Sequence, residues 1–242
     1  MTRSASAIDL QRQFYNDRWH DFTFANRLKL ERCIAILEAL RSTRIREPRI
    51  IDLGCGSGWL ASILGVFGPT TAVDLSDVAI DEAQKRYSHV NFYQADIMNW
   101  EYPEEAFDIA VSQEVIEHVE DQDRYLRIAR GLLRTGGFLI LTTPNARTFY
   151  ALPEEVRKAW SNQPIENWIS IAELRKLLKP HFDILHISTI IPGYGVKGSY
   201  RFVNSQRFYH VLKLLRLHNT FDWARLKAGY GLHTIAVAQK RP

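Results

Sequence analysis

A short apolar segment that runs into three alternating glycines constrains the fold more than any other feature of the chain. Residues 49–53 have the character of a buried strand, and residues 59–66 are predicted to form the helix that follows. Between them, Gly54, Gly56 and Gly58 lie where the backbone must turn sharply and a ligand can approach it. This order predicts the first unit of a doubly wound α/β fold, with a nucleotide-like ligand at the turn. A tight connection that binds nothing is the simpler alternative.

The glycine spacing argues against a dinucleotide as that ligand. The dinucleotide motif has its third glycine three residues after the second, and this chain has Trp59 at that position. Asp52 lies two residues ahead of the glycines, where its carboxylate would repel a diphosphate and attract a ligand that carries an ammonium and a sulfonium group. The turn is therefore expected to bind a ligand of the second kind.

Two further predicted strands also end in an acid. Residues 70–74 end in Asp74, and residues 90–95 are followed by Asp96. Because the carboxyl ends of parallel strands meet at the same edge of a sheet, both acids are expected beside the glycine loop, with Asp74 in reach of a ribose diol. Three strands that each end in a carboxylate, in this order, are much more specific than the glycines alone.

Together these motifs resemble the class I S-adenosylmethionine (SAM) dependent methyltransferases, and most of all small-molecule enzymes like the ubiquinone-biosynthesis O-methyltransferases. The motifs cover about residues 49–143, and beyond Pro144 the resemblance rests on architecture alone. It implies an α/β fold with a doubly wound, seven-stranded Rossmann-like sheet of order 3-2-1-4-5-7-6, strand 7 being antiparallel, and SAM as the cofactor. The cofactor contacts that it implies are Asp52, Gly54, Cys55, Gly56, Gly58, Asp74, Leu75, Asp96, Ile97 and Gln113, with Asp96 receiving the adenine amino group.

The segment after the fourth predicted strand, residues 107–112, carries the candidate catalytic groups. This strand is expected beside the first, at the point where the strand order reverses and ligands bind. His118 and Glu117 are the catalytic candidates, because His118 can take the proton of a hydroxyl acceptor. A histidine that only packs or hydrogen-bonds at the start of a helix is the alternative. Glu114 is a candidate contact to the acceptor.

The same three side chains could also hold a metal. Glu114, Glu117 and His118 share one face of a helix, in a pattern that resembles the metal-holding segment of some O-methyltransferases. A further oxygen or nitrogen ligand is not evident in the sequence, so no resident metal is expected. The segment also lacks the Asn/Asp-Pro-Pro-aromatic run that is typical of enzymes acting on base amino groups, which argues against that acceptor.

The length of 242 residues and the hydrophobic content of 46% fit one methyltransferase domain, residues 1–242. Residues 1–45 are expected to form a helical cap. Its Tyr15 and Trp19 either face the cofactor pocket or pack the first helix onto the sheet. Residues 193–231 form an insertion between the sixth predicted strand (182–191) and the seventh (233–239).

The insertion is basic and aromatic, with seven Lys and Arg, one acid and eight aromatic residues. We expect it to cover the acceptor half of the cleft as a lid, with Tyr194 and Arg201 near the acceptor and Asn145 facing it from the end of the fifth strand. One alternative is an amphipathic helix that packs on the end of the sheet. Another is a surface for RNA or for a membrane.

Composition limits the partners and the compartment. The net charge of +4 and the pI near 9.1 allow an anionic partner without requiring one. Two cysteines give no disulfide framework, and no apolar run reaches the roughly 18 residues of a membrane span, so a cytoplasmic protein is expected. No DNA partner is expected, and RNA is the weaker alternative. Peripheral membrane contact and the oligomeric state stay open.

The function expected from these features is SAM-dependent methyl transfer to a hydroxyl of a small-molecule acceptor. The alternatives are N-methylation of a small molecule or peptide, ribose methylation of RNA, and a SAM-binding partner subunit without catalysis.

Overall fold

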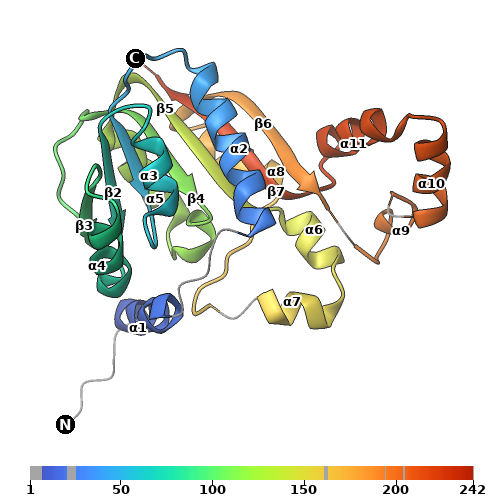
Figure 1. Ribbon diagram of the computed structural model, residues 1–242, viewed down its shortest axis with the longest axis horizontal. Helices are drawn as coiled ribbons and strands as arrows, with labels where there is room; N and C mark the ends of the chain where they lie inside the picture. The colour runs from blue at the N-terminus through green and yellow to red at the C-terminus, as the bar shows by residue number, and fades with distance from the viewer. Residues whose placement is uncertain (1–6, 21–25, 161–162, 194, 204, 242) are drawn as a thin grey trace, which may run out of the picture.

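The computed structural model describes residues 7–20, 26–160, 163–193, 195–203 and 205–241. These residues form a seven-stranded sheet with helices on both faces (Figure 1). The strand order is β3-β2-β1-β4-β5-β7-β6, and β7 runs antiparallel to both of its neighbours. The predicted fold class, strand order and direction of the last strand are therefore confirmed. The strands are β1 (Ile50–Leu53), β2 (Thr70–Asp74), β3 (Asn91–Gln94), β4 (Phe107–Gln113), β5 (Leu133–Pro144), β6 (Phe182–Pro192) and β7 (Gly231–Lys240).

The central strands are buried on both faces, which is why they read as continuous apolar runs. Ile51 and Leu53 belong to the core that includes residues of α5 (Gln122–Leu132) and α8 (Ile171–Leu178), whereas Ile50 belongs to the core formed with α2 (Arg27–Ser42) and α3 (Trp59–Leu64). Successive side chains of one strand thus point into opposite layers. The remaining helices are α1 (Ala7–His20), α4 (Asp77–Arg86), the 3-10 turn η1 (Ile116–His118), α6 (Ala146–Ala151), α7 (Glu154–Trp160), α9 (Tyr200–Val203), α10 (Gln206–Leu214) and α11 (His218–Lys227).

The switch in strand order positions the site. β1 pairs with β2 on one side and with β4 on the other, so that Leu53 lies level with both Val73 and Ser112. The loops that leave β1, β2 and β4 therefore emerge at one edge of the sheet. The helix α1 lies across this edge beside α4 (Figure 1).

The insertion takes a different course from the one expected of a lid. The helices α9, α10 and α11 leave the end of β6 and form a lobe that projects away from the sheet before the chain returns in β7 (Figure 1). The helix α11 contacts β6, and α10 packs on α11.

Candidate active site

The glycine loop joins β1 to α3 in a conformation that requires glycine. Gly54 and Gly58 have φ angles of +76° and +73°, in the left-handed region. A Cβ atom on Gly58 would lie 2.7 Å from the ring of Phe92 and 2.8 Å from the Cβ of Ala83. The backbone N–H groups of Gly54 and Cys55 donate to the carbonyl of Val73, at 2.8 and 3.0 Å, and tie the loop to β2. The loop is thus held with its backbone toward the cleft.

Asp74 at the end of β2 holds this loop from its other side. Its Oδ2 accepts a hydrogen bond from the N–H of Gly56 at 2.7 Å, and its Oδ1 accepts one from the N–H of Ser76 at 2.9 Å. The carboxylate is buried, and burial raises the pKa of Asp74 while these N–H groups oppose the rise. A carboxylate oxygen can accept more than one hydrogen bond, so the pair of oxygens retains capacity for two hydroxyl groups.

A cleft of about 820 Å³ opens beside the loop. Eleven of the predicted site residues line it: Tyr15, Gly54, Cys55, Gly56, Asp74, Leu75, Asp96, Ile97, Gln113, Glu114 and His118. Asp52, Gly58 and Glu117 lie beneath these residues and are buried. Residues from four strand ends and from the N-terminal helices thus surround one cavity, as ligand sites in open α/β sheets do.

Asp52 carries a carboxylate oxygen that lacks a protein partner. The side chain is 1% exposed, and Oδ2 has no hydrogen bond among the described residues. Burial, together with the charge of Asp74, raises the pKa of Asp52 to about 7. A buried acceptor without a donor costs free energy until a ligand supplies one. An ammonium group would satisfy it, so this position fits the methionine end of SAM.

The raised pKa of Asp52 predicts a pH dependence of cofactor binding. Below pH 7 the free protein holds a proton on Asp52, and a cationic ligand must displace it. We expect the affinity for S-adenosylhomocysteine to be full above pH 7 and to fall by up to about tenfold per unit as the pH drops from 7 to 5. Calorimetry at pH 6 in two buffers of different ionisation enthalpy should show release of close to one proton. In Asp52→Asn the pH dependence should vanish, and a flat profile in the unsubstituted protein would contradict this assignment.

Asp96 shapes the loop after β3. Its Oδ1 accepts from the N–H of Met98 at 3.0 Å, and its Oδ2 accepts from Nδ2 of Asn99 at 2.6 Å. The carboxylate is half-buried and lines the cleft next to Ile97. This geometry leaves acceptor capacity toward the cavity, where the family resemblance implies an adenine amino group.

Glu114 follows β4 in a left-handed conformation, with φ at +58°, which is strained for a residue other than glycine. Its Oε2 lies 2.8 Å from Nδ1 of His233 in β7. The Nε2 of that histidine lies 3.2 Å from Nη1 of Arg32 in α2. Because arginine only donates, Nε2 accepts and Nδ1 carries the proton toward Glu114. Burial alone would raise the pKa of Glu114, but His233 and Arg32 lower it to about 2.

Sequence reasoning missed both partners of Glu114. Arg32 lies in a helix far before the glycine loop, and His233 lies in the last strand, so no local pattern connects them. The pairing nevertheless fixes the carboxylate as an anion at the floor of the cleft. It also joins α2 and β7 to the segment that follows β4.

Glu117 is buried behind the cleft beside Glu114. The side chain is 1% exposed, and its Oε2 accepts a hydrogen bond from Oγ1 of Thr143 at 2.9 Å. Burial and the negative charge of Glu114 raise the pKa of Glu117 well above its usual range. These surroundings therefore favour the protonated form of Glu117 over the carboxylate.

His118 is oriented as a neutral base. Its Nδ1 lies 2.9 Å from the carbonyl of Ile165, so Nδ1 donates and the lone pair stays on Nε2. The Nε2 lies 3.6 Å from Oε1 of Glu117. Burial lowers the pKa of His118 below its usual value, which keeps the ring uncharged. Gln11 of α1 donates to the backbone carbonyl of His118 at 2.7 Å and holds the segment in place.

Two of the three side chains that were weighed as metal ligands contact other partners. Glu114 pairs with His233 and Glu117 with Thr143. Among the residues that the structure describes, no group of three His, Cys, Asp or Glu side chains is arranged to hold a metal ion.

The N-terminal helices supply one wall of the cleft. The hydroxyl of Tyr15 donates to Oε1 of Gln163 at 2.8 Å, and burial raises the pKa of this phenol. Three bases, Arg18, Lys29 and Arg32, line the same cavity from α1 and α2. Sequence reasoning missed them because charges in an amphipathic helix usually face solvent. The side chain of Trp19 lies outside the described residues.

Two predicted acceptor contacts lie elsewhere. The amide of Asn145 donates to Oγ1 of Thr148 and to the carbonyls of Gly229 and Gly231, at 3.1, 3.0 and 2.8 Å, and so fastens the root of the insertion. Arg201 is exposed on α9. Neither lines the cleft, nor does any other described residue of the segment 193–231, so the expected cover over the acceptor is not formed. Tyr194 lies outside the described residues.

No helix among the described residues is long and apolar enough to cross a membrane.

Comparison with known proteins agrees with this geometry. A family model described as a methyltransferase domain matches residues 24–183. A Mycobacterium tuberculosis protein named a probable S-adenosylmethionine-dependent methyltransferase is 35% identical over 101 residues, 41% of this chain and 37% of that protein. A ubiquinone biosynthesis O-methyltransferase of Coxiella burnetii is 33% identical over 112 residues, 44% of this chain and 47% of that enzyme. The matches thus span less than half the length of these two relatives.

The fold is shared more widely than the sequence. The N-methyltransferase NodS of Bradyrhizobium japonicum, solved in complex with S-adenosyl-L-homocysteine, superposes with a TM-score of 0.63 at 16% identity, covering 97% of this chain and 100% of that one. The family match extends over more than half of the chain and includes the glycine loop, the acids that follow β2 and β3, and the segment after β4. The chain therefore belongs to the methyltransferase domain family, within class I of the SAM-dependent methyltransferases.

Proposed function

We propose that this protein transfers a methyl group from SAM to a hydroxyl of a small-molecule acceptor, with His118 as the general base. The observation that carries the proposal is the state of His118. It is neutral, its ring is oriented by the carbonyl of Ile165, and it lines the same cleft as the glycine loop. A hydroxyl must lose its proton during attack, and the unprotonated Nε2 of a neutral histidine can accept it.

The residues that would hold SAM fit its chemical groups. The unpartnered oxygen of Asp52 suits an ammonium, and the carboxylate of Asp74 suits a ribose diol. The amide nitrogen of Gln113 is buried at the same cleft, has no hydrogen-bond partner among the residues that the structure describes, and can donate to a carboxylate. SAM supplies a methyl group that is already activated by the sulfonium, so the protein's own tasks are to align the acceptor, exclude water and remove a proton.

Three bases favour an acceptor that carries a carboxylate or a phosphate. Arg18, Lys29 and Arg32 line the cleft on the side of α1 and α2, on the same wall as Tyr15. An anionic group of the acceptor would be attracted to this wall, which would leave its hydroxyl free to face His118. The Tyr15 ring offers an apolar surface for the body of such a molecule.

Matched acceptors separate this proposal from its alternatives. We expect formation of S-adenosylhomocysteine with 3,4-dihydroxybenzoate and 4-hydroxybenzoate to exceed that with catechol and phenol, which lack the carboxylate, by about tenfold in kcat/KM. The amine 4-aminobenzoate should be a poorer acceptor than 4-hydroxybenzoate, which carries a hydroxyl at the same position. Preference for the amine would indicate N-methylation, and no turnover of any acceptor despite SAM binding would favour a binding subunit.

A further inference from the structure

The lobe formed by α9, α10 and α11, residues 196–227, exposes large apolar side chains at a much higher density than the other described residues. Of the sixteen large hydrophobic side chains that the described residues expose, eight lie in this lobe: Val196, Phe202, Phe208, Val211, Leu214, Leu215, Leu217 and Trp223. Phe202 is 80% and Leu214 is 82% exposed. Exposed apolar residues that gather in one region usually mark a surface that binds something.

The lobe is firmly attached at its root, so this exposure is not a consequence of a loose chain end. The hydroxyl of Tyr200 contacts Oγ1 of Thr148 at 2.5 Å, and the Oγ1 of Thr189 donates to the carbonyl of Leu226 at 2.6 Å. The guanidinium of Arg147 lies 4.2 Å from the centre of the Tyr230 ring. The helix α11 is therefore fixed to the sheet, and α10 is carried outward on it.

The apolar face of α10 has little of the protein to pack on. Phe208, Val211 and Leu215 follow helical spacing, and each is exposed. Phe208 contacts Phe221 of α11, with ring centres 5.4 Å apart. The amphipathic pattern of this segment allows a helix that packs on the end of the sheet. In the structure α10 packs on α11 instead. Its apolar stripe is left for an outside partner.

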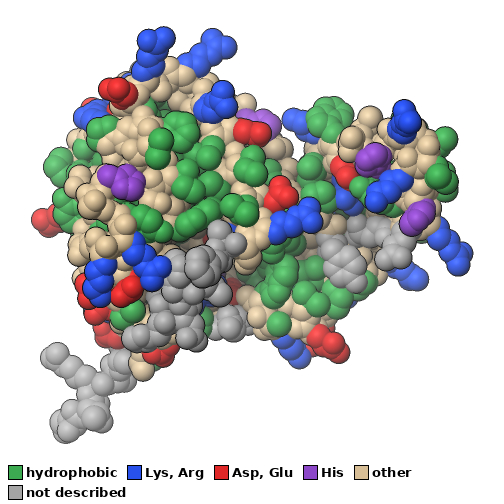
Figure 2. Space-filling view, in the orientation of Figure 1, with side chains coloured by type: hydrophobic (Ala, Val, Ile, Leu, Met, Phe, Trp, Pro, Cys, Tyr) green, Lys and Arg blue, Asp and Glu red, His purple; other side chains and the backbone are tan. Residues whose placement is uncertain are grey.

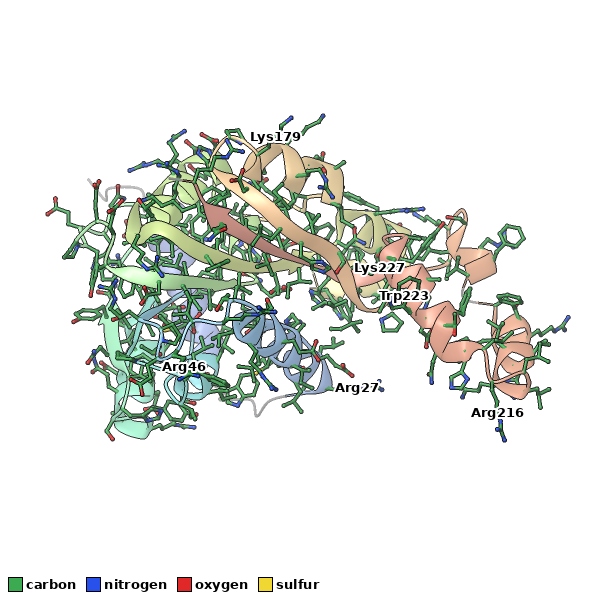
Figure 3. All side chains as sticks on the ribbon, turned by 90° about the horizontal axis from the view of Figure 1, so that it is seen from above. Arg27, Arg46, Lys179, Arg216, Trp223 and Lys227 are labelled. Atoms are coloured by element: carbon green, nitrogen blue, oxygen red, sulfur yellow. The ribbon has the colours of Figure 1, made fainter. Side chains whose placement is uncertain are left out.

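The charge of the lobe indicates the chemistry of that partner. The segment holds seven bases and one acid, Asp222, whose Oδ1 lies 2.8 Å from Nη2 of Arg225. No second acid in this segment balances the other six bases. Figure 2 shows basic and hydrophobic side chains side by side over this lobe, and Figure 3 shows Arg216, Trp223 and Lys227 on its helices.

We propose that this lobe docks the protein on an anionic lipid bilayer, with the apolar side chains of α10 at the level of the headgroups and the Lys and Arg side chains on lipid phosphates. Amphipathic helices rich in Lys and Arg, with Trp, Phe and Leu exposed, bind membrane interfaces in this way. A second copy of the chain is disfavoured because two such lobes repel each other. RNA would pair with the bases but offers no apolar partner for the aliphatic side chains of Val211, Leu214, Leu215 and Leu217.

Vesicle flotation with the full chain tests this proposal. The vesicles are phosphatidylcholine alone or with about one third phosphatidylglycerol, at low and at high salt. Two double variants each remove one contribution. The charge variant, Lys213→Glu with Arg216→Glu, removes basic charge, and the leucine variant, Leu214→Ser with Leu215→Ser, removes apolar surface. The matched controls are Arg46→Glu with Lys179→Glu on the main body (Figure 3) and Val66→Ser, an exposed side chain beyond α3. Thermal melting verifies that each variant folds.

The expected result is partition onto the anionic vesicles at least about tenfold above that onto phosphatidylcholine, weakened by salt. Each lobe variant should lose about tenfold or more, and the controls should stay within about twofold. Equal partition onto both vesicle types, or lobe variants that bind like the unsubstituted chain, would overturn the proposal. Without vesicle binding, a dimer in solution that dissociates in the leucine variant would indicate a second copy of the chain as the partner. Without vesicle binding, binding of single-stranded RNA that only the charge variant abolishes would indicate RNA as the partner.

Discussion

Replacing Asp74 by alanine is expected to weaken the binding of S-adenosylhomocysteine by about 100-fold. The carboxylate accepts hydrogen bonds from the N–H groups of Gly56 and Ser76, so the substitution leaves two buried donors unsatisfied. Each such group costs on the order of 1–3 kcal/mol, and the ribose hydroxyls lose their acceptor as well. The effect therefore combines a displaced glycine loop with a lost ligand contact.

Calorimetric titration with S-adenosylhomocysteine measures this effect without knowledge of the acceptor. Asp74→Asn keeps one oxygen acceptor and should lose less affinity than Asp74→Ala. Asp77→Ala is the matched control, since Asp77 is an exposed acid at the start of α4, close in sequence, and does not line the cleft. An affinity for Asp74→Ala within threefold of the unsubstituted protein would show that Asp74 supports neither the loop nor the ligand.

Replacing His118 by alanine is expected to lower kcat by about 10² to 10⁴-fold, the usual contribution of a positioned general base. The affinity for SAM should change little, because none of the contacts assigned to the cofactor comes from His118. The hydrogen bond from Nδ1 to the carbonyl of Ile165 orients the ring, and the substitution removes both the ring and this bond. Single-turnover methylation of the best acceptor separates the chemical step from binding.

The pH profile identifies the base more sharply than the rate alone. The His118 ring must be neutral to accept a proton, and burial lowers its pKa below the ordinary value. Activity at saturating SAM should therefore persist below pH 6.5 and then fall about tenfold per unit once the pH drops below the lowered pKa. The residual rate of His118→Ala should lack this acid limb. His186→Ala, at an exposed histidine of β6, is the matched control. A loss of less than tenfold, or an unchanged acid limb, would assign His118 a structural role.

The elements of this fold and the cofactor half of the site follow from local patterns. An apolar run specifies a buried strand, and glycines at 54 and 58 are needed because both residues have positive φ. In a parallel sheet the strand ends meet at one edge, so acids that follow three strands must gather there. Asp74 and Asp96 could thus be placed beside the loop from the sequence, and both line the cleft.

The acceptor half depends on contacts between distant segments. Glu114 is anionic because β7 brings His233 to it and α2 brings Arg32 close to that histidine. His233 and Glu114 are more than a hundred residues apart in the sequence. The pKa of Glu117 is raised because the side chain is buried beside that anion, and no pattern within residues 113–119 indicates this. Asn145 was expected at the acceptor, but the return of the chain into β7 places the carbonyls of Gly229 and Gly231 against its amide.

The insertion shows the same division between local pattern and packing. The amphipathic spacing of residues 206–215 and the excess of bases are properties of the sequence, and they predict a helix with an apolar face and a basic surface. They do not specify which way that face points. Its direction follows from the anchoring of α11 on β6, which carries α10 outward past the sheet instead of over the cleft. Local periodicity specifies a helix and its faces, whereas the partner of each face is decided by the packing of the whole chain.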